Sequence, residues 1–305
     1  MVDTVVITYN FVIAMIAYAC QIGILSVALS LNIITDEIPN YALGGIIGTG
    51  HLISWTVTKE IGILPYYGLP VAFLVGGMIN VALFFGLIKR TVKAGRNLVL
   101  ITLATIGVEF IITSFNKIWW FWIVEQTYWG FSLFLKSYDM QILGFSGGFV
   151  FSVVAVSFTM VLIWLIPWLN VGRVFVAFTE NPLLVSVQGI NVKRVKAFIW
   201  FISGGLACIV GAISPFLFHS SVSWTFYFVT AGLTGSILGG VRSLRYALVG
   251  GFMIGLVEFL FTVLGQAYVG VWVDEYRPFI PILILALVMY FAPDGVLSKI
   301  QRGIQ

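Results

Sequence analysis

The sequence predicts an all-α protein: a polytopic transmembrane helical bundle of about eight or nine spans, with a short cytoplasmic helix. Three observations support this prediction. Of the 305 residues, 60% are hydrophobic and only 9% are charged, whereas soluble domains carry roughly 25% charged residues. Apolar runs of spanning length recur along the chain, and the basic residues collect in alternate loops between them. We therefore expect a single transmembrane domain over residues 1–305.

A membrane-spanning helix needs about 20 mainly apolar residues. Runs that approach or exceed this length occupy residues 9–31, 38–57, 69–88, 97–115, 146–169, 197–218, 224–241, 246–266 and 278–292. The second, seventh and last runs are short or rich in glycine, so their status as spans is marginal. The start of the chain lacks a basic region and its first run is long enough to span, so we expect no cleavable signal peptide.

Lysine and arginine residues predict the orientation of the spans. Four lie in loop 89–96, four in 172–196, two in 242–245 and two near the C-terminus, so twelve of the 16 fall on one side of a nine-span bundle. The positive-inside rule makes that side cytoplasmic, with the N-terminus outside and the C-terminus in the cytoplasm of a multi-pass protein of the cell membrane. Loop 32–38, which contains Asp36, is the one turn on this side without a positive charge.

Residues 116–145 form the long external segment of this topology. It contains Trp119, Trp120, Trp122 and Trp129. Because tryptophan is amphipathic and gathers at membrane–water interfaces, we expect an aromatic belt at the outer face. Docking of an outer partner is the alternative interpretation.

Several kinds of chemistry are absent from the sequence. It has no ATP-binding loop of the form G-x-x-x-x-G-K-[ST]. His51 and His219 lie far apart, without carboxylates at metal-binding spacing. Cys20 and Cys208 lie in apolar runs, so we expect two buried free thiols rather than a disulfide. The sequence therefore argues against an enzyme, a cofactor bound by this chain or a nucleic-acid partner, and it favours transport or conduction.

Two carboxylates, Glu109 and Glu258, lie in the middle of predicted spans, where an ionisable group is costly and is often functional. Each belongs to a polar stripe with helical offsets of three or four residues. The stripes comprise Thr102, Thr105, Glu109, Thr113 and Asn116, and Gly251, Gly255, Glu258, Thr262 and Gln266. In lipid such a stripe must face a partner helix or a wet cavity. The candidate substrate-pathway residues are Asn80, Thr102, Thr105, Glu109, Glu258 and Thr262. For the carboxylates and the asparagine, hydrogen bonding between helices is the alternative.

Glycines four residues apart predict close packing of helices. Such pairs are Gly44 and Gly48, Gly235 and Gly239, and Gly251 and Gly255. The alternative is that residues 38–50 and 232–241 form broken helices that line a cavity.

Residues 172–196 form the most informative cytoplasmic segment. Asn181 followed by Pro182 is typical of a helix start, Gly189 suits a left-handed helix end, and Asn191 can cap the next helix. The pattern predicts an apolar helix of about two turns outside the bilayer, which must bury one face. Three interpretations of this helix stay open: its apolar face packs on the chain's own loops, lies in the lipid interface, or binds a cytoplasmic motor protein.

Several strings along the chain occur in a recognisable order. They are Ile38-Pro39-Asn40-Tyr41-Ala42, Leu103-Ala104-Thr105-Ile106-Gly107, Glu180-Asn181-Pro182, Gly189-Ile190-Asn191, Leu238-Gly239-Gly240-Val241-Arg242-Ser243, Gly255-Leu256-Val257-Glu258 and Ala292-Pro293-Asp294-Gly295-Val296. Together, over roughly residues 20–297, they resemble the permeases of branched-chain amino acid importers of the ATP-binding-cassette (ABC) class.

The resemblance implies a permease subunit of an importer for branched-chain or related amino acids, embedded in membrane lipid. It implies three kinds of partner: a second homologous permease subunit, two cytoplasmic ATPase subunits that bind ATP and Mg²⁺, and an extracytoplasmic solute-binding protein. It also implies that the 172–196 segment couples this subunit to the ATPases. The coupling residues would be Glu180, Asn181, Pro182, Leu184, Gly189, Ile190 and Asn191.

Two other functions stay open. One is a stand-alone secondary transporter or channel in which Glu109 or Glu258 carries protons. The other is a membrane-embedded enzyme, which the lack of a nucleophile–base or metal constellation disfavours. The chain departs from the family pattern at Leu43, Leu184 and Val185 among other positions, which leaves the substrate open between amino acids, amides and urea.

Overall fold

The computed structural model describes residues 2–88, 98–124, 134–168, 192–218 and 225–291. Its α-helices are α1 (Val2–Asp36), α2 (Leu43–Trp55), α3 (Gly68–Leu83), α5 (Leu98–Val124), α6 (Gly147–Leu165), α9 (Val192–Leu217), α10 (Thr225–Gly239), α11 (Leu244–Tyr268) and α12 (Phe279–Phe291). Each predicted apolar run overlaps one of these helices, so the all-α prediction is confirmed for the described residues. The other elements are short: η1 (Thr56–Glu60), η2 (Pro65–Tyr67), η3 (Phe84–Ile88), η4 (Lys136–Tyr138), η5 (Ile166–Trp168), η6 (Val271–Tyr276), and the antiparallel pair β1 (Gln141–Ile142) and β2 (Phe145–Ser146). Cys20 and Cys208 are buried free thiols, as predicted.

Six of the described helices are long and apolar enough to cross a membrane, namely α1, α3 with its flanking turns, α5, α6, α9 and α11. The helices α10 and α12 are shorter, and α2 has only 13 residues. These three are the runs that the sequence marked as marginal. An α-helix of 13 residues is about 20 Å long, less than the hydrocarbon thickness of about 30 Å, and α2 continues directly into the π-helical turn η1.

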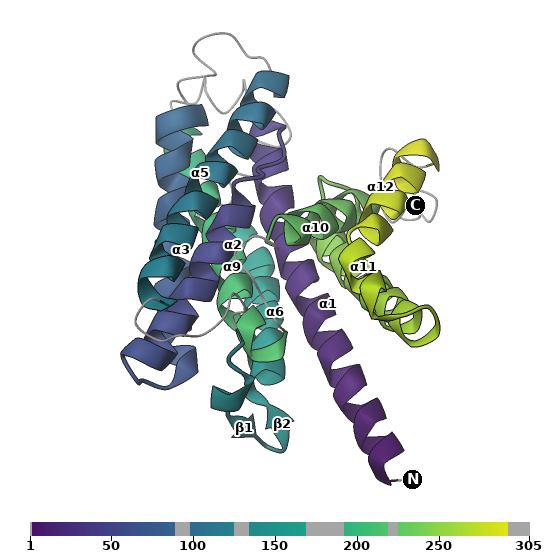
Figure 1. The fold of residues 1–305 in the computed structure, drawn as a ribbon. Helices are drawn as coiled ribbons and strands as arrows, with labels where there is room; N and C mark the ends of the chain where they lie inside the picture. Colours follow the sequence, from purple (N-terminus) through teal and green to yellow (C-terminus); the bar gives the residue numbers. More distant parts are fainter. Residues whose placement is uncertain (1, 89–97, 125–133, 169–191, 219–224, 292–305) are drawn as a thin grey trace.

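The long helix α1 lies between two groups of helices (Figure 1). On one side are α2, α3, α5, α6 and α9, and on the other are α10, α11 and α12. Helix α1 packs most extensively on α11 and also contacts α9, α10 and α6. Helix α2 is central to the larger group, because it packs on α9, α5, α3 and α10 and every residue from Leu43 to Trp55 is buried.

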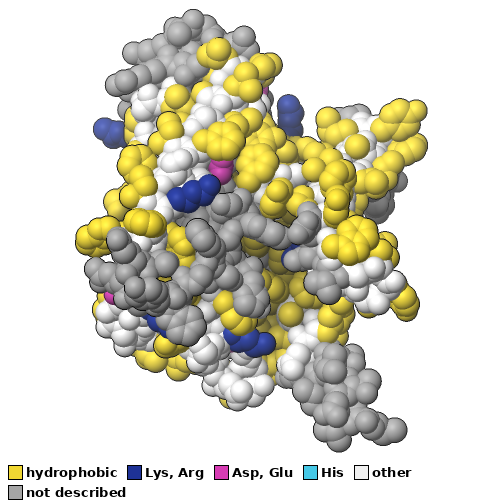
Figure 2. Space-filling view, viewed as in Figure 1, with side chains coloured by type: hydrophobic (Ala, Val, Ile, Leu, Met, Phe, Trp, Pro, Cys, Tyr) yellow, Lys and Arg dark blue, Asp and Glu magenta, His cyan; other side chains and the backbone are white. Residues whose placement is uncertain are grey.

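The outer surface of the bundle is apolar. Hydrophobic side chains cover much of the face in Figure 2, with only scattered charges between them. On α5, Phe110, Phe115 and Trp122 are among the most exposed side chains. Exposed apolar patches of this extent are unusual on soluble proteins and fit a helix that faces lipid.

Glycine allows close contact between the helices. A Cβ atom added to Gly211 of α9 would lie 2.0 Å from the carbonyl oxygen of Ile47 in α2. A Cβ atom on Gly235 of α10 would lie 2.3 Å from the Cα of Gly251 in α11. The predicted packing role of the latter two glycines is therefore confirmed.

We expect Gly211→Ala to destabilise the protein, because its methyl group would push α9 away from the α2 backbone. Overpacking of this kind typically costs about 1–3 kcal/mol. The matched control is Gly107→Ala in α5, where an added Cβ meets nothing within 4 Å and alanine favours the helix. Thermal unfolding midpoints of the two variants in one detergent check this; equal midpoints would contradict the packing role.

Helix α5 is longer than the sequence predicted. The apolar run ends at residue 115, but α5 continues to Val124, so the first part of segment 116–145 is helical. The amide Nδ2 of Asn116 donates to the carbonyl oxygen of Gly45 over 2.8 Å, and Trp120 packs edge-on against Trp55. Because these contacts satisfy the polar residues inside the bundle, the helix does not end where the hydropathy falls.

Candidate functional site

The predicted coupling residues lie outside the described part of the chain. All seven, from Glu180 to Asn191, fall within residues 169–191, so their role stays a prediction. The described structure resumes at Val192, the first residue of α9. The contacts of α9 therefore show how the end of the predicted 172–196 segment is anchored in the bundle.

A buried ion pair anchors the first turns of α9 to the end of α1. The Nζ of Lys196 lies 2.6 Å from Oδ1 of Asp36 and donates to the carbonyl oxygen of Thr35 over 2.8 Å. The Nε1 of Trp200 donates to Oδ2 of the same aspartate over 2.8 Å. The aspartate side chain is 7% exposed. Both carboxylate oxygens are thus engaged by α9, and a displacement of its first turns would disturb α1.

An asparagine pair extends this anchor to α2 and α3. The Nδ2 of Asn80 in α3 donates to the carbonyl oxygen of Trp200 over 2.7 Å, and its Oδ1 accepts from Asn40 over 2.9 Å. The Oδ1 of Asn40 accepts the backbone N–H of Ala42 just before α2. In this arrangement the side chain of Asn80 serves hydrogen bonding between helices.

The sequence analysis counted Lys196 among the basic residues of segment 172–196 but did not pair it or Trp200 with Asp36. The available signal was loop 32–38, the acidic turn without a positive charge, since a buried Asp36 requires a basic partner from elsewhere.

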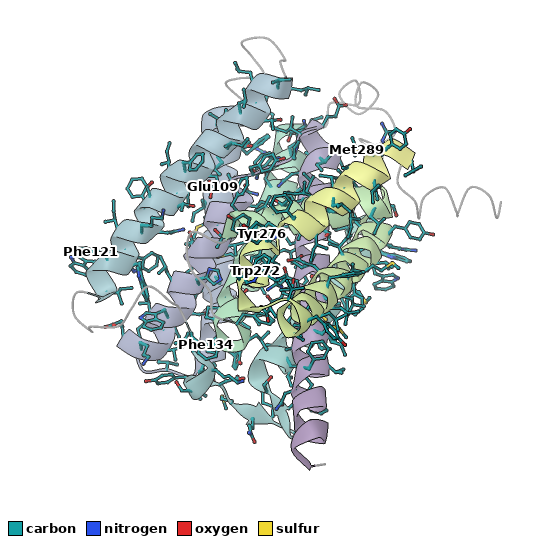
Figure 3. The ribbon with its side chains drawn as sticks, turned by 45° about the vertical axis from the view of Figure 1, so that its right-hand side comes forward. Glu109, Phe121, Phe134, Trp272, Tyr276 and Met289 are labelled. Atoms are coloured by element: carbon teal, nitrogen blue, oxygen red, sulfur yellow. The ribbon has the colours of Figure 1, made fainter. Side chains whose placement is uncertain are left out.

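The predicted stripe on α5 faces α2. Thr105, Glu109, Thr113 and Asn116 are buried, and Figure 3 shows Glu109 on α5. Its Oε1 accepts from Thr113 over 2.9 Å.

The hydroxyl groups of the stripe bond at both of its ends. The Oγ1 of Thr105 accepts from the backbone N–H of Tyr41, and Thr49 of α2 donates to Oδ1 of Asn116 over 3.1 Å. Thr102 is half-buried and bonds within its own helix. The stripe thus presents a carboxylate beside the start of α2, which can attract a cationic group.

Glu258 has a different environment from Glu109. Its Oε1 lies 2.8 Å from Nε of Arg277 and accepts from the hydroxyl of Tyr18 over 2.7 Å. The guanidinium also lies over the Tyr18 ring, 4.1 Å from its centroid. Thr262 donates to the carbonyl oxygen of Glu258 within α11. These contacts join α1, α11 and the turn before α12. They correspond to the interpretation in which Glu258 makes hydrogen bonds between helices.

The sequence did not pair Arg277 or Tyr18 with Glu258. The signal was the rule that an intramembrane carboxylate needs a partner, but 240 residues separate Tyr18 from Glu258.

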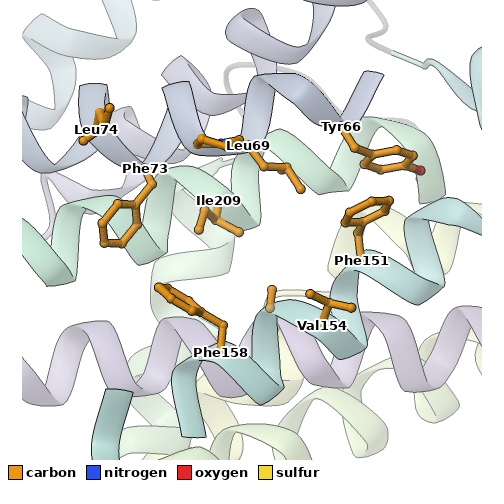
Figure 4. Close-up of a pocket in the computed structure, with 10 residues that line it drawn as sticks. Tyr66, Leu69, Phe73, Leu74, Phe151, Val154, Phe158 and Ile209 are labelled. Carbon is orange, nitrogen blue, oxygen red and sulfur yellow. The ribbon is translucent and has the colours of Figure 1, made fainter. Parts of the chain in front are cut away.

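A cavity of about 520 Å³ lies between α3, α6 and α9 (Figure 4). Its lining is almost wholly apolar and includes Leu69, Phe73, Phe151, Phe158 and Ile209. Such a lining suits hydrocarbon and offers nothing to a charged solute, so this cavity is not the candidate substrate route.

Comparisons with known proteins bear on the whole chain. A sequence profile described as branched-chain amino acid transport system / permease component matches residues 11–291. The probable branched-chain amino acid transport permease protein LivH of Methanocaldococcus jannaschii is 29% identical over 286 residues, covering 92% of this chain and 90% of that protein. The high-affinity branched-chain amino acid transport system permease protein LivH of Escherichia coli K12 is 28% identical over 132 residues, which are 43% of this chain and 40% of that protein.

A solved structure has a similar fold. PsaBC from Streptococcus pneumoniae in complex with Fab matches with a TM-score of 0.52 over 95% of both chains, at 14% sequence identity. At this identity the match concerns the fold alone.

Proposed function

This chain belongs to the family of permease components of branched-chain amino acid transport systems, and from that premise we propose that it carries a branched-chain or closely related amino acid across the membrane. It is a multi-pass membrane protein and the permease subunit of an ABC importer. The observation that carries the proposal is the profile match over residues 11–291, which includes both polar stripes and the predicted coupling segment. The substrate, the route and the specific partners are parts of the proposal.

The proposed route runs along the stripe on α5. An amino acid at neutral pH carries an ammonium and a carboxylate, so its route needs a few polar groups among apolar walls. Glu109 supports this choice because its carboxylate accepts a hydrogen bond from a neutral hydroxyl, that of Thr113, whereas Glu258 pairs with Arg277. Thr102 and Thr105 extend the stripe toward the start of α5.

In this proposal the energy for transport comes from ATP hydrolysis by cytoplasmic ATPase subunits, which bind residues 180–191. Lys196 follows this segment by one helical turn and is bonded to α1. A pull on the segment would therefore reach α1 and, through Asn80 and Asn40, the start of α2. A second permease subunit and an extracytoplasmic binding protein complete the proposed assembly, with the C-terminus in the cytoplasm.

The test is leucine uptake into proteoliposomes that contain the assembled transporter. We expect uptake to require the solute-binding protein outside and ATP inside, and to stop when ATP is replaced by a non-hydrolysable analogue. Uptake by this chain alone, driven by a proton gradient without ATPase subunits, would instead establish the secondary-transporter alternative.

A further inference from the structure

Buried polar groups without a hydrogen-bond partner are concentrated on one short segment of the described structure. Five such atoms lie between residues 51 and 58, namely both ring nitrogens of His51, Nε1 of Trp55 and the hydroxyls of Thr56 and Thr58, and another is Oδ1 of Asn32 in α1. His51 is 1% exposed and Trp55 is 5% exposed. Native proteins satisfy most buried polar groups, and an unsatisfied one calls for an explanation. A histidine that served only as core packing would be expected to bond through at least one nitrogen.

Three of these residues share one face of the helix. His51, Trp55 and Thr58 are spaced by four and three residues, which places them in line along α2 and η1. Gly44 and Gly48 continue the same line toward the start of α2, since seven residues make nearly two whole turns. We call these five residues the His51 face.

The surroundings of Gly44 show where the His51 face points. An added Cβ there would lie 3.4 Å from Cγ of Glu109 in α5, 3.4 Å from Cγ2 of Val229 and 3.5 Å from Cα of Phe226, both in α10. The face therefore looks toward α5 and α10 at the end where Glu109 lies. His51 follows two turns further along, about 10 Å away at 1.5 Å per residue.

The backbone at the other end of the face is irregular. Residues Thr56–Glu60 form the π-helical turn η1, and such turns occur frequently at functional sites. Short helices are also the elements that line substrate routes in many transporters, and α2 is a buried helix of 13 residues.

We propose that the His51 face lines the amino-acid passage and that the N–H groups of His51 and Trp55 donate hydrogen bonds to the substrate carboxylate. Glu109, which lies beside Gly44 at the other end of the His51 face, receives the substrate ammonium. The separation of about 10 Å exceeds the span between the two charged groups of one α-amino acid, so the groups act in succession, and Gly44 and Gly48 keep the wall between them free of side chains. The inference deepens the proposed function and rests on it for the identity of the substrate.

The first measurement is leucine uptake by the assembled transporter with substituted permease. His51→Leu should lower uptake about tenfold or more, the scale of a lost hydrogen bond to a charged group. His51→Asn, which keeps a donor and an acceptor, should retain more uptake than His51→Leu. The matched control is Ser54→Ala on the same helix, whose hydroxyl already bonds to the carbonyl oxygen of Ala212 in α9; its uptake should match the wild type. Wild-type uptake by His51→Leu would overturn the inference.

The second measurement does not depend on the substrate. In the assembled transporter during ATP turnover, His51→Cys should react with a water-soluble methanethiosulfonate reagent, whereas Ser54→Cys should not react above the background of buried Cys20 and Cys208. Leucine with its binding protein should slow the reaction at position 51. An unreactive His51→Cys in a transporter that imports leucine would overturn the inference, including where His51→Leu fails to assemble. If the wild type imports no leucine but His51→Cys reacts in an ATP-dependent manner, the passage stands and the proposed substrate fails.

Discussion

Replacement of Lys196 by methionine should lower the free energy of unfolding by about 3 kcal/mol, because it leaves the carboxylate of Asp36 buried without its cationic partner. The lower end of the usual range applies, since the lysine side chain is 20% exposed and water screens part of the interaction. Trp200 would still donate to Asp36, but one neutral donor does not offset a buried charge. Thermal or denaturant unfolding of the purified variant in detergent measures the effect.

Two further variants separate the charge from the packing. Lys193→Met removes an exposed lysine about one turn earlier in α9 and should unfold like the wild type. The double variant Asp36→Asn with Lys196→Met removes both charges and should be more stable than Lys196→Met alone. If Lys196→Met and Lys193→Met unfold at the same temperature, the ion pair does not contribute to the stability of the protein. Leucine uptake should fall in Lys196→Met as well, because the first turns of α9 would lose their ion pair with α1.

Replacement of Arg277 by methionine should have a similar effect on the opposite side of α1. The buried carboxylate of Glu258 would keep the hydroxyl of Tyr18 as a partner but lose the guanidinium, and removal of one partner from a buried pair costs about 3 kcal/mol or more. The loss of the contact between the guanidinium and the Tyr18 ring adds to this cost. We expect Glu258→Gln combined with Arg277→Met to recover part of the lost stability, measured by unfolding in detergent.

The same variants decide between the two interpretations of Glu258. If this carboxylate serves only to join helices, Glu258→Gln should reduce stability while leaving the KM for leucine uptake unchanged. A changed KM in a well-assembled Glu258→Gln transporter would place the group in the substrate route instead. Arg245→Met, which removes an exposed arginine from the same helix, is the matched control for both readouts.

The sequence was a good guide to helices and to buried faces. Hydropathy located every described helix, because a chain in lipid must satisfy its backbone within helices. The offsets of three and four residues identified Thr105, Glu109, Thr113 and Asn116 as one face, and all four are buried against a partner helix. The predicted end of α5 was wrong, because hydropathy alone does not show that Asn116 is hydrogen-bonded to Gly45 of another helix.

The polar networks were beyond the sequence for a physical reason. Asp36 and Lys196 lie 160 positions apart, and Arg277 appeared to be an ordinary loop cation until the fold placed it against Glu258. Which charges meet depends on how the helices pack, and a single sequence carries no direct record of that. For His51 the sequence showed a histidine within an apolar run. Only the folded chain shows that both of its ring nitrogens are buried without a hydrogen-bond partner.

The short, enclosed helix α2 has a consequence for biosynthesis. Its principal neighbour α9 begins at Val192, some 137 residues after α2 ends at Trp55, so the ribosome completes α2 long before the helix that will cover it exists. Until then its serine, threonine and histidine side chains would face lipid, which disfavours them. The nascent α2 must therefore be retained by the insertion machinery or shielded by its earlier neighbours α3 and α5 until α9 emerges, so truncation of the chain before α9 should leave a product that quality-control proteases degrade.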